Sequence, residues 1–329
     1  MHNTIENGRL LTPHNGLKVT WFDRWDPLIN EALMSLPEVE LCPHELYRRL
    51  LQNPSPGHKR IALITLKGVP IAVVGLRQRG RYSWEPLTQW MIPGFVFPAR
   101  PGYLIPSLDA LRRDVWVAWW RMEAPPTTSQ AIRYLESTPT YKIKCSEDFE
   151  QYWRDNGYFK TIRRMRNRTK DFTLVVNSPG SAEWTIKKWE ERWRKNPMKA
   201  DPSLSDRILI TKYLEERKCH FTLMLLDQDI PIGGATMIVH NKDLVASVLY
   251  NDTNYRSHGV GIRLIDLCFD FAAANNFEIF DIGGGYDYKN KWARKDGERW
   301  LFNVCPEPLF KVKQFVNHVR KKSGINLRS

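Results

Sequence analysis

Residues 256–261 (Arg-Ser-His-Gly-Val-Gly) combine cationic side chains with two closely spaced glycines. They lie between an apolar segment that ends at Tyr250 and an amphipathic segment that runs to Asn275. We therefore predict a loop at the N-terminus of a helix, where backbone N–H groups have no helical partner. These donors and the positive end of the helix dipole suit an anionic phosphate, so a phosphate site is predicted here.

Polar side chains that could act on a bound substrate follow the next apolar segment, residues 277–282. Asp281 lies at the end of this predicted buried strand, where sites of α/β proteins often lie. It could be a base, or it could hold down the glycine-rich loop that follows, which is the favoured interpretation. Tyr286 and Tyr288 could donate a proton, because an unperturbed tyrosine with a pKa of about 10 is protonated at neutral pH. Lys289 could bind an anionic acceptor or stabilise negative charge; packing and solvation are the alternatives for these side chains.

The elements that must position these residues follow from hydrophobic periodicity. A strand at 243–250, a helix at 259–275 and a strand at 277–282 favour a parallel crossover unit. Two further apolar runs, at 219–226 and 230–239, precede it and are separated by a turn. The second part of the chain is therefore predicted to be an antiparallel meander followed by a crossover helix.

An earlier part of the chain repeats this pattern. Apolar runs at 60–66 and 69–76 flank a Lys-Gly turn and predict a hairpin. The sequence Val-Pro-Ile-Ala-Val that begins at Val69 matches Ile-Pro-Ile-Gly-Gly at 230–234. A predicted helix that starts at Ser107 and a strand at 115–120 follow. We infer an internal duplication, and because the first copy lacks the Arg-x-x-Gly-x-Gly loop, the second is expected to hold the active cleft.

The remaining segments give weaker patterns. Helices are predicted from Asp26-Pro27, at 43–53, at 127–137, from Ser146, at 158–170, at 181–195 and at 203–217, with strands at 141–145 and 172–176. The helix at 158–170 is rich in basic residues and has no acidic one. It could bind RNA phosphates or nucleotide-sugar phosphates, or it could be a solvated face. The candidate binding residues are Arg163, Arg164, Arg166 and Arg168.

Length and composition limit the possible domain organisation, partners and location of the protein. The 329 residues allow two domains, for which we predict the ranges 1–145 and 146–329, and the 42% hydrophobic content is enough for real cores. A net charge of +13 indicates an anionic partner, an anionic substrate or a negative membrane surface. The five cysteines are scattered without metal-ligand spacing, so no metal is predicted. The N-terminus lacks a signal-peptide pattern and no segment reads as transmembrane, so a cytoplasmic protein is expected.

The order of meander, Arg256-x-x-Gly259-x-Gly261 loop, helix and strand resembles the GNAT acyltransferase superfamily. Phe280-Asp281-Ile-Gly283, followed by Tyr288-Lys289, is similar to the signature of the CelD/FemAB-like acetyltransferases, which carry two GNAT modules. The implied fold is α/β with an α+β mixed sheet, built as two tandem GNAT-like modules, each a central mixed β-sheet flanked by helices. The N-terminal module would be degenerate and the C-terminal one catalytic. The long helical arm frequent in FemAB-type transferases has no counterpart here.

The resemblance also assigns roles to individual residues. It implies that the pyrophosphate of coenzyme A lies on Arg256, Ser257, His258, Gly259, Val260, Gly261 and Ile262. It further implies that the strand ending at Tyr250 diverges from its neighbour, so that its backbone N–H groups hold the thioester carbonyl. The candidate catalytic residues are then Tyr250, Asp281, Tyr286, Tyr288 and Lys289.

Three functions follow from these patterns. The first is transfer of an acyl group from acyl-CoA, without a metal, to an amine or hydroxyl of a small metabolite or amino-sugar in polysaccharide, envelope or natural-product biosynthesis. The second is peptide-bond formation from aminoacyl-tRNA by a FemAB-like aminoacyltransferase, with tRNA bound through the positive charge. The third is a non-catalytic nucleic-acid-binding protein on a GNAT scaffold.

Overall fold

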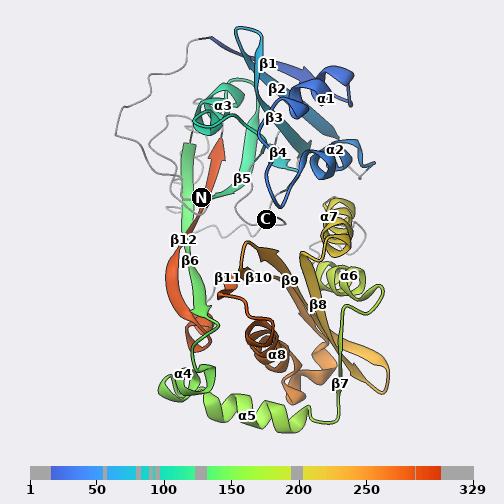
Figure 1. Cartoon of the computed structure of the whole chain (residues 1–329), viewed down its shortest axis with the longest axis vertical. Helices are drawn as coiled ribbons and strands as arrows, with labels where there is room; N and C mark the ends of the chain where they lie inside the picture. The colour runs from blue at the N-terminus through green and yellow to red at the C-terminus, as the bar shows by residue number, and fades with distance from the viewer. Residues whose placement is uncertain are drawn as a thin grey trace, which may run out of the picture.

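The computed structural model describes residues 16–54, 58–78, 83–88, 92, 97–122, 132–193, 203–285 and 287–304. Their strands form one continuous twelve-stranded sheet with helices on both of its faces (Figure 1). No helix among these residues is both long enough and apolar enough to cross a bilayer.

Two copies of one element order, β-α-α-β-β-β-α-β, make up most of the structure. The first repeat consists of β1 (Leu17–Phe22), α1 (Pro27–Met34), α2 (His44–Gln52), β2 (Lys59–Leu66), β3 (Val69–Gln78), β4 (Ser83–Pro86), α3 (Leu104–Leu111) and β5 (Trp116–Met122). The second consists of β7 (Thr173–Val176), α6 (Ser181–Trp193), α7 (Leu204–Glu216), β8 (His220–Asp227), β9 (Ile230–His240), β10 (Asp243–Asn251), α8 (Val260–Ala274) and β11 (Ile279–Gly284), with the 3₁₀ helix η1 (Thr253–His258) before α8.

The elements outside the repeats link and extend them. Between the repeats lie β6 (Ile132–Lys144), α4 (Phe149–Asp155) and α5 (Phe159–Arg168). After the second repeat come the 3₁₀ helix η2 (Asp287–Lys291) and β12 (Arg294–Val304). We call α4 and α5 the α4–α5 hairpin.

The sheet is symmetric about its two central strands. Its order is β1-β2-β3-β4-β5-β12-β6-β11-β10-β9-β8-β7. Each repeat has one parallel pair, β4 with β5 and β10 with β11, and the other pairs are antiparallel. β12, from the end of the chain, pairs with β5 of the first repeat, whereas β6 pairs with β11 of the second. The duplication and the mixed, helix-flanked modules are confirmed, while the boundary at residues 145 and 146 stays a prediction because the sheet runs on without a break.

Several predicted element boundaries were wrong. Residues 132–137, predicted as helix, belong to β6, because antiparallel pairing with β12 overrides local propensity; 127–131 lie outside the described residues. α3 begins at Leu104 rather than Ser107, since Pro106 is tolerated in a first turn that lacks helical N–H partners. α4 begins after Asp148, whose carboxylate accepts the N–H of Gln151. The start of α1 is confirmed, with Asp26 as cap and proline in the first turn.

Helices α6 and α8 cover opposite faces of the second repeat's sheet. A Cβ atom on Gly233 would lie 2.7 Å from Cγ1 of Val260 in α8, and one on the adjacent Gly234 would overlap Thr185 in α6. Because successive strand residues point to opposite faces, this Gly-Gly pair lets both helices approach β9 closely. It therefore fixes where the first turn of α8 lies against the sheet.

Helix α7 of the second repeat packs onto the first repeat through a buried ion cluster. The Arg77 guanidinium pairs with Asp206 of α7 and, at 2.8 Å, with Glu85 of β4. Asp206 also accepts hydrogen bonds from Asn53 at 2.7 Å and from Lys59 at 3.1 Å. Arg77 is 1% exposed and Asp206 is 0% exposed. Apolar side chains of α7 join the core of the first repeat, so the two halves share buried surface as well as the sheet.

Candidate active site

Strands β10 and β11 separate within the second repeat. Their parallel pairing stops at Val245 opposite Asp281, and a bulge follows at Ser247. Beyond it β10 pairs with β9, where the Val248 N–H donates to a threonine hydroxyl at 3.0 Å. Since strand N–H groups alternate in direction, that of Leu249 points toward the side from which β11 has diverged. The opening between the strands is thus bordered by a backbone donor.

The predicted phosphate loop lies at the far end of β10. It is a 3₁₀ turn rather than an irregular loop, and it is followed by Gly259 in the left-handed conformation (φ 73°) and then by α8. The first-turn N–H groups of α8 precede any helical carbonyl that could accept them. Arg256, Ser257 and His258 are exposed, Gly259 and Gly261 are half-buried and Val260 is buried. We call residues 256–262 the phosphate cradle, because cations and helix N–H groups meet there.

Two residues that the sequence analysis did not identify border the cradle. Arg192 of α6 donates to the backbone carbonyl of Asn251 at 3.0 Å. A Cβ atom on Gly261 would lie 3.0 Å from Oδ1 of Asn251. Asn251 directly follows the predicted strand residue Tyr250, which could have marked it, whereas nothing in the sequence connects Arg192 with this position.

Asp281 and Lys289 both hold the glycine-rich end of β11. Asp281, 3% exposed, accepts the Gly283 N–H at 2.6 Å and pairs with Arg299 at 3.0 Å. The Lys289 ammonium donates to the carbonyls of Ile282 at 2.6 Å and Gly284 at 2.9 Å. These contacts favour the structural role of Asp281 and give Lys289 a similar one. Arg299, from β12, was not identified by the sequence analysis.

The candidate proton donors differ in environment. Tyr250 packs edge-on against Trp184 of α6, with ring centroids 5.5 Å apart. Burial, followed by the nearby Asp252 carboxylate, raises the pKa of Tyr250, so its phenol stays protonated at neutral pH. Tyr288 is 50% exposed, and Tyr286 lies outside the described residues.

The four arginines predicted on α5 do not act together. Arg166 donates to both oxygens of the fully buried Asp266 at 2.9 and 2.7 Å, and hydrogen bonding to that carboxylate raises the pKa of Arg166. Arg168 donates to the backbone carbonyl of Ser257 at 2.7 Å. Arg163 and Arg164 are exposed. Arg168 is exposed as well, so of the four it is Arg166 that is held by a buried carboxylate.

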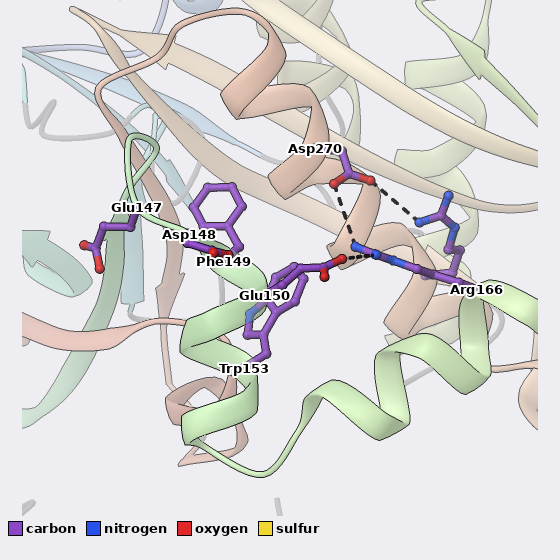
Figure 2. A pocket seen from close by; sticks show the side chains of 8 residues that line it. Glu147, Asp148, Phe149, Glu150, Trp153, Arg166 and Asp270 are labelled. Atoms are coloured by element: carbon purple, nitrogen blue, oxygen red, sulfur yellow. Dashed lines mark hydrogen bonds and ion pairs between the residues drawn. The ribbon is translucent and has the colours of Figure 1, made fainter.

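A pocket of about 470 Å³ lies between α4, α5 and α8 (Figure 2). Its lining is highly charged, and Figure 2 shows Glu150 and Asp270 in ion pairs with arginines. Burial, and then the neighbouring Asp266, raises the pKa of Asp270. The lining residues are Glu147, Asp148, Phe149, Glu150, Trp153, Arg166, Arg263 and Asp270. Glu147 pairs with Arg294 and Asp148 caps α4, so each lining carboxylate has a partner within the protein, and we assign the pocket no ligand.

Replacing Lys289 by Met is expected to lower the free energy of unfolding by about 1–3 kcal/mol, since two carbonyls lose a charged donor. Denaturant unfolding measures this loss. Lys291→Met is the matched control, because Lys291 is exposed in the same 3₁₀ helix and lies over the ring of Tyr158 in a cation–π pair at 5.4 Å. Equal small losses in both variants would show that Lys289 is merely solvated.

Comparison with known proteins agrees with the geometry. Residues 156–290 match the family model of the acetyltransferase (GNAT) domain. No curated protein sequence matches the chain. The C-terminal domain of a proposed lysylphosphatidylglycerol synthetase from Agrobacterium fabrum is similar in structure, with a TM-score of 0.52 and 13% identity over 89% of this chain and 96% of that one.

Two further structures are similar over comparable lengths. L-PGS from Bacillus licheniformis has a TM-score of 0.51 and 10% identity over 88% of this chain and 95% of that one. A tandem GNAT protein from the clavulanic acid biosynthesis pathway has a TM-score of 0.49 and 10% identity, covering 88% and 98%. At such low sequence identity, the two structures with TM-scores above 0.5 show that the fold is shared over nearly the whole chain.

Proposed function

We propose that this chain, a double GNAT module whose second repeat carries the acetyltransferase domain, moves an acyl group from acyl-CoA to an amine or hydroxyl of a small acceptor. One observation carries the proposal: β10, which borders the opening between β10 and β11, runs on to the turn before α8, whose first N–H groups have no helical acceptor. An acyl donor such as acyl-CoA has a diphosphate at one end and a thioester at the other. It therefore needs a phosphate site and a carbonyl site at a set distance from each other.

The residues of the chain fit this donor. The cradle combines helix N–H groups with Arg256 and His258, which suits a diphosphate. The Leu249 N–H supports an oxyanion role, because a fixed backbone donor stabilises charge that develops on a carbonyl oxygen. Coenzyme A supplies the activated acyl group. Tyr250 and Tyr288 are our candidates for protonating the departing thiolate, since Tyr250 remains protonated at neutral pH.

The identity of the acceptor and of the pathway is the more specific part of the proposal. The CelD/FemAB-like signature at residues 280–289 leads us to favour an amino-sugar or a similar small metabolite. We assign removal of the acceptor's proton to water or to the substrate itself, rather than to a His-Asp-Ser arrangement. A cytoplasmic location stays a prediction.

A second candidate is an aminoacyl-tRNA-dependent transferase. The observation that favours it is the outer face of α5, where Lys160, Arg163 and Arg164 are exposed, with the exposed Lys170 just after the helix. Such a face suits the phosphates of RNA. In this function the same cleft would hold the aminoacyl end of tRNA.

Turnover with purified donors separates these functions. We expect the protein to release free thiol from acetyl-CoA in the presence of an amino-sugar panel, and ribonuclease treatment to leave the rate unchanged. Activity that requires aminoacyl-tRNA and disappears with ribonuclease would favour the second candidate. Salt-dependent nucleic-acid binding without coenzyme A affinity would contradict both and favour a non-catalytic protein on the same scaffold.

A further inference from the structure

We propose that the α4–α5 hairpin, which belongs to neither repeat, positions the phosphate cradle, and that Arg168 is the positioning residue at its end. The proposal rests on the proposed function in one respect: it takes the cradle to be the donor's phosphate site. It assigns Arg168 a role toward the protein's own backbone rather than toward RNA.

The end of α5 contacts the cradle at successive points. The Arg168 guanidinium donates to the Ser257 carbonyl at 2.7 Å. A Cβ atom on Gly259 would overlap the sulfur of Met165, so glycine is needed both for this contact and for its left-handed backbone. Just beyond α5, Phe172 packs on His258 with ring centroids 5.8 Å apart. The whole turn before α8 thus lies against one end of the α4–α5 hairpin.

The α4–α5 hairpin is itself fixed to the body of α8, beside which α5 lies (Figure 1). Arg166 holds Asp266 with two hydrogen bonds, and Ile162 and Met165 of α5 are buried. Thr169 ends α5 by donating its hydroxyl to the Met165 carbonyl at 2.8 Å. α5 therefore links the middle of α8 to the turn before it, and the turn cannot shift without breaking these contacts.

The turn is a short 3₁₀ segment with bonds at both ends and one side-chain anchor. Asp252 accepts the Asn254 N–H at 2.8 Å, and the Gly259 N–H bonds to the Arg256 carbonyl at 3.1 Å. The Tyr255 hydroxyl donates to Asp227 at 2.8 Å, and the backbone angles of Tyr255 are non-helical. The hydrogen-bond geometry of a 3₁₀ segment is poorer than that of an α-helix, and any ordering of the turn on binding would weaken affinity for a phosphate. Arg168 reduces that loss by holding the Ser257 carbonyl in place beforehand.

The test compares Arg168→Ala with Arg154→Ala, which removes an exposed cation from the other helix, α4. We expect Arg168→Ala to raise the Kd for coenzyme A about three- to tenfold, the range of one charge-assisted hydrogen bond reduced by solvent exposure. Amide hydrogen exchange of residues 257–262 should speed up by a similar factor without ligand. Arg168→Lys should restore part of both effects, and Arg154→Ala should change neither.

The outcomes separate this proposal from the proposed function. Failure of the unmodified protein to bind coenzyme A would overturn the function, while the exchange measurement would still decide whether Arg168 orders the turn. Unchanged exchange in Arg168→Ala would overturn the positioning role. Equal weakening of coenzyme A binding by Arg154→Ala and Arg168→Ala, with equal salt dependence, would overturn it as well, because general attraction by positive charge would then explain both.

Discussion

Gly261→Trp is expected to abolish coenzyme A binding, with Kd rising more than about a hundredfold, which corresponds to losing two or more charge-assisted hydrogen bonds. Gly261 is half-buried in the first turn of α8, between the cradle's N–H groups and Asn251. An indole there would cover the donors that a diphosphate needs. Titration with coenzyme A, followed by calorimetry, measures the loss.

The matched control is Gly261→Ala. Its Cβ would meet only the end of the Asn251 side chain at 3.0 Å, and that amide can move by a few tenths of an ångström. We expect binding within about threefold of the unmodified protein, because less than 1 kcal/mol is involved. Near-normal binding in Gly261→Trp, with an unchanged thermal midpoint in both variants, would place the donor elsewhere.

Asp206→Ala is expected to lower the free energy of unfolding by about 3–5 kcal/mol, the range for removing one partner of a buried ion pair. The substitution leaves the guanidinium of Arg77, which is 1% exposed, with Glu85 as its remaining partner in the cluster. Lys59, whose pKa is lowered by burial, loses an ion-pair partner as well. Equilibrium denaturation measures the change.

Lys212→Ala provides a control on the same helix. Lys212 is 59% exposed and pairs with Glu183 at 2.9 Å, so its loss should cost less than about 1 kcal/mol. If Asp206→Ala cost no more than this control, the ion cluster would not be what joins α7 to the first repeat. A second unfolding transition in Asp206→Ala would show that the two halves had lost their coupling.

Features set by neighbouring residues could be predicted from the sequence. The cap and proline that begin α1, the hairpin of β2 and β3, and the crossover from β10 through α8 to β11 depend on contacts within one segment or between adjacent ones. The end of β6, from Tyr141, was predicted, but its first part could not be, because its partner β12 lies far along the chain: Thr138 bonds to the carbonyl of Arg299, 161 positions away. Local propensity carries no information about such a pairing.

The candidate site likewise has a part that could be predicted from the sequence and a part that could not. The glycine pattern of the cradle is contiguous, so its position at a helix N-terminus could be predicted. Its supports come from elsewhere: Arg168 is 89 positions from Ser257, and Arg192 is 59 from Asn251. In the basic helix α5, spacing alone could not separate Arg166, which pairs with the buried Asp266, from Arg163, which is exposed.

The pairing of β12 with β5 of the first repeat has a consequence for synthesis on the ribosome. The antiparallel partner of β5 comes from residues 300–304, so one edge of the early sheet stays bare until those residues have been translated. An uncovered strand edge is a site for unwanted pairing with other chains. Nascent chains stalled before residue 294 should therefore recruit chaperones and aggregate, whereas chains released after residue 304 should not.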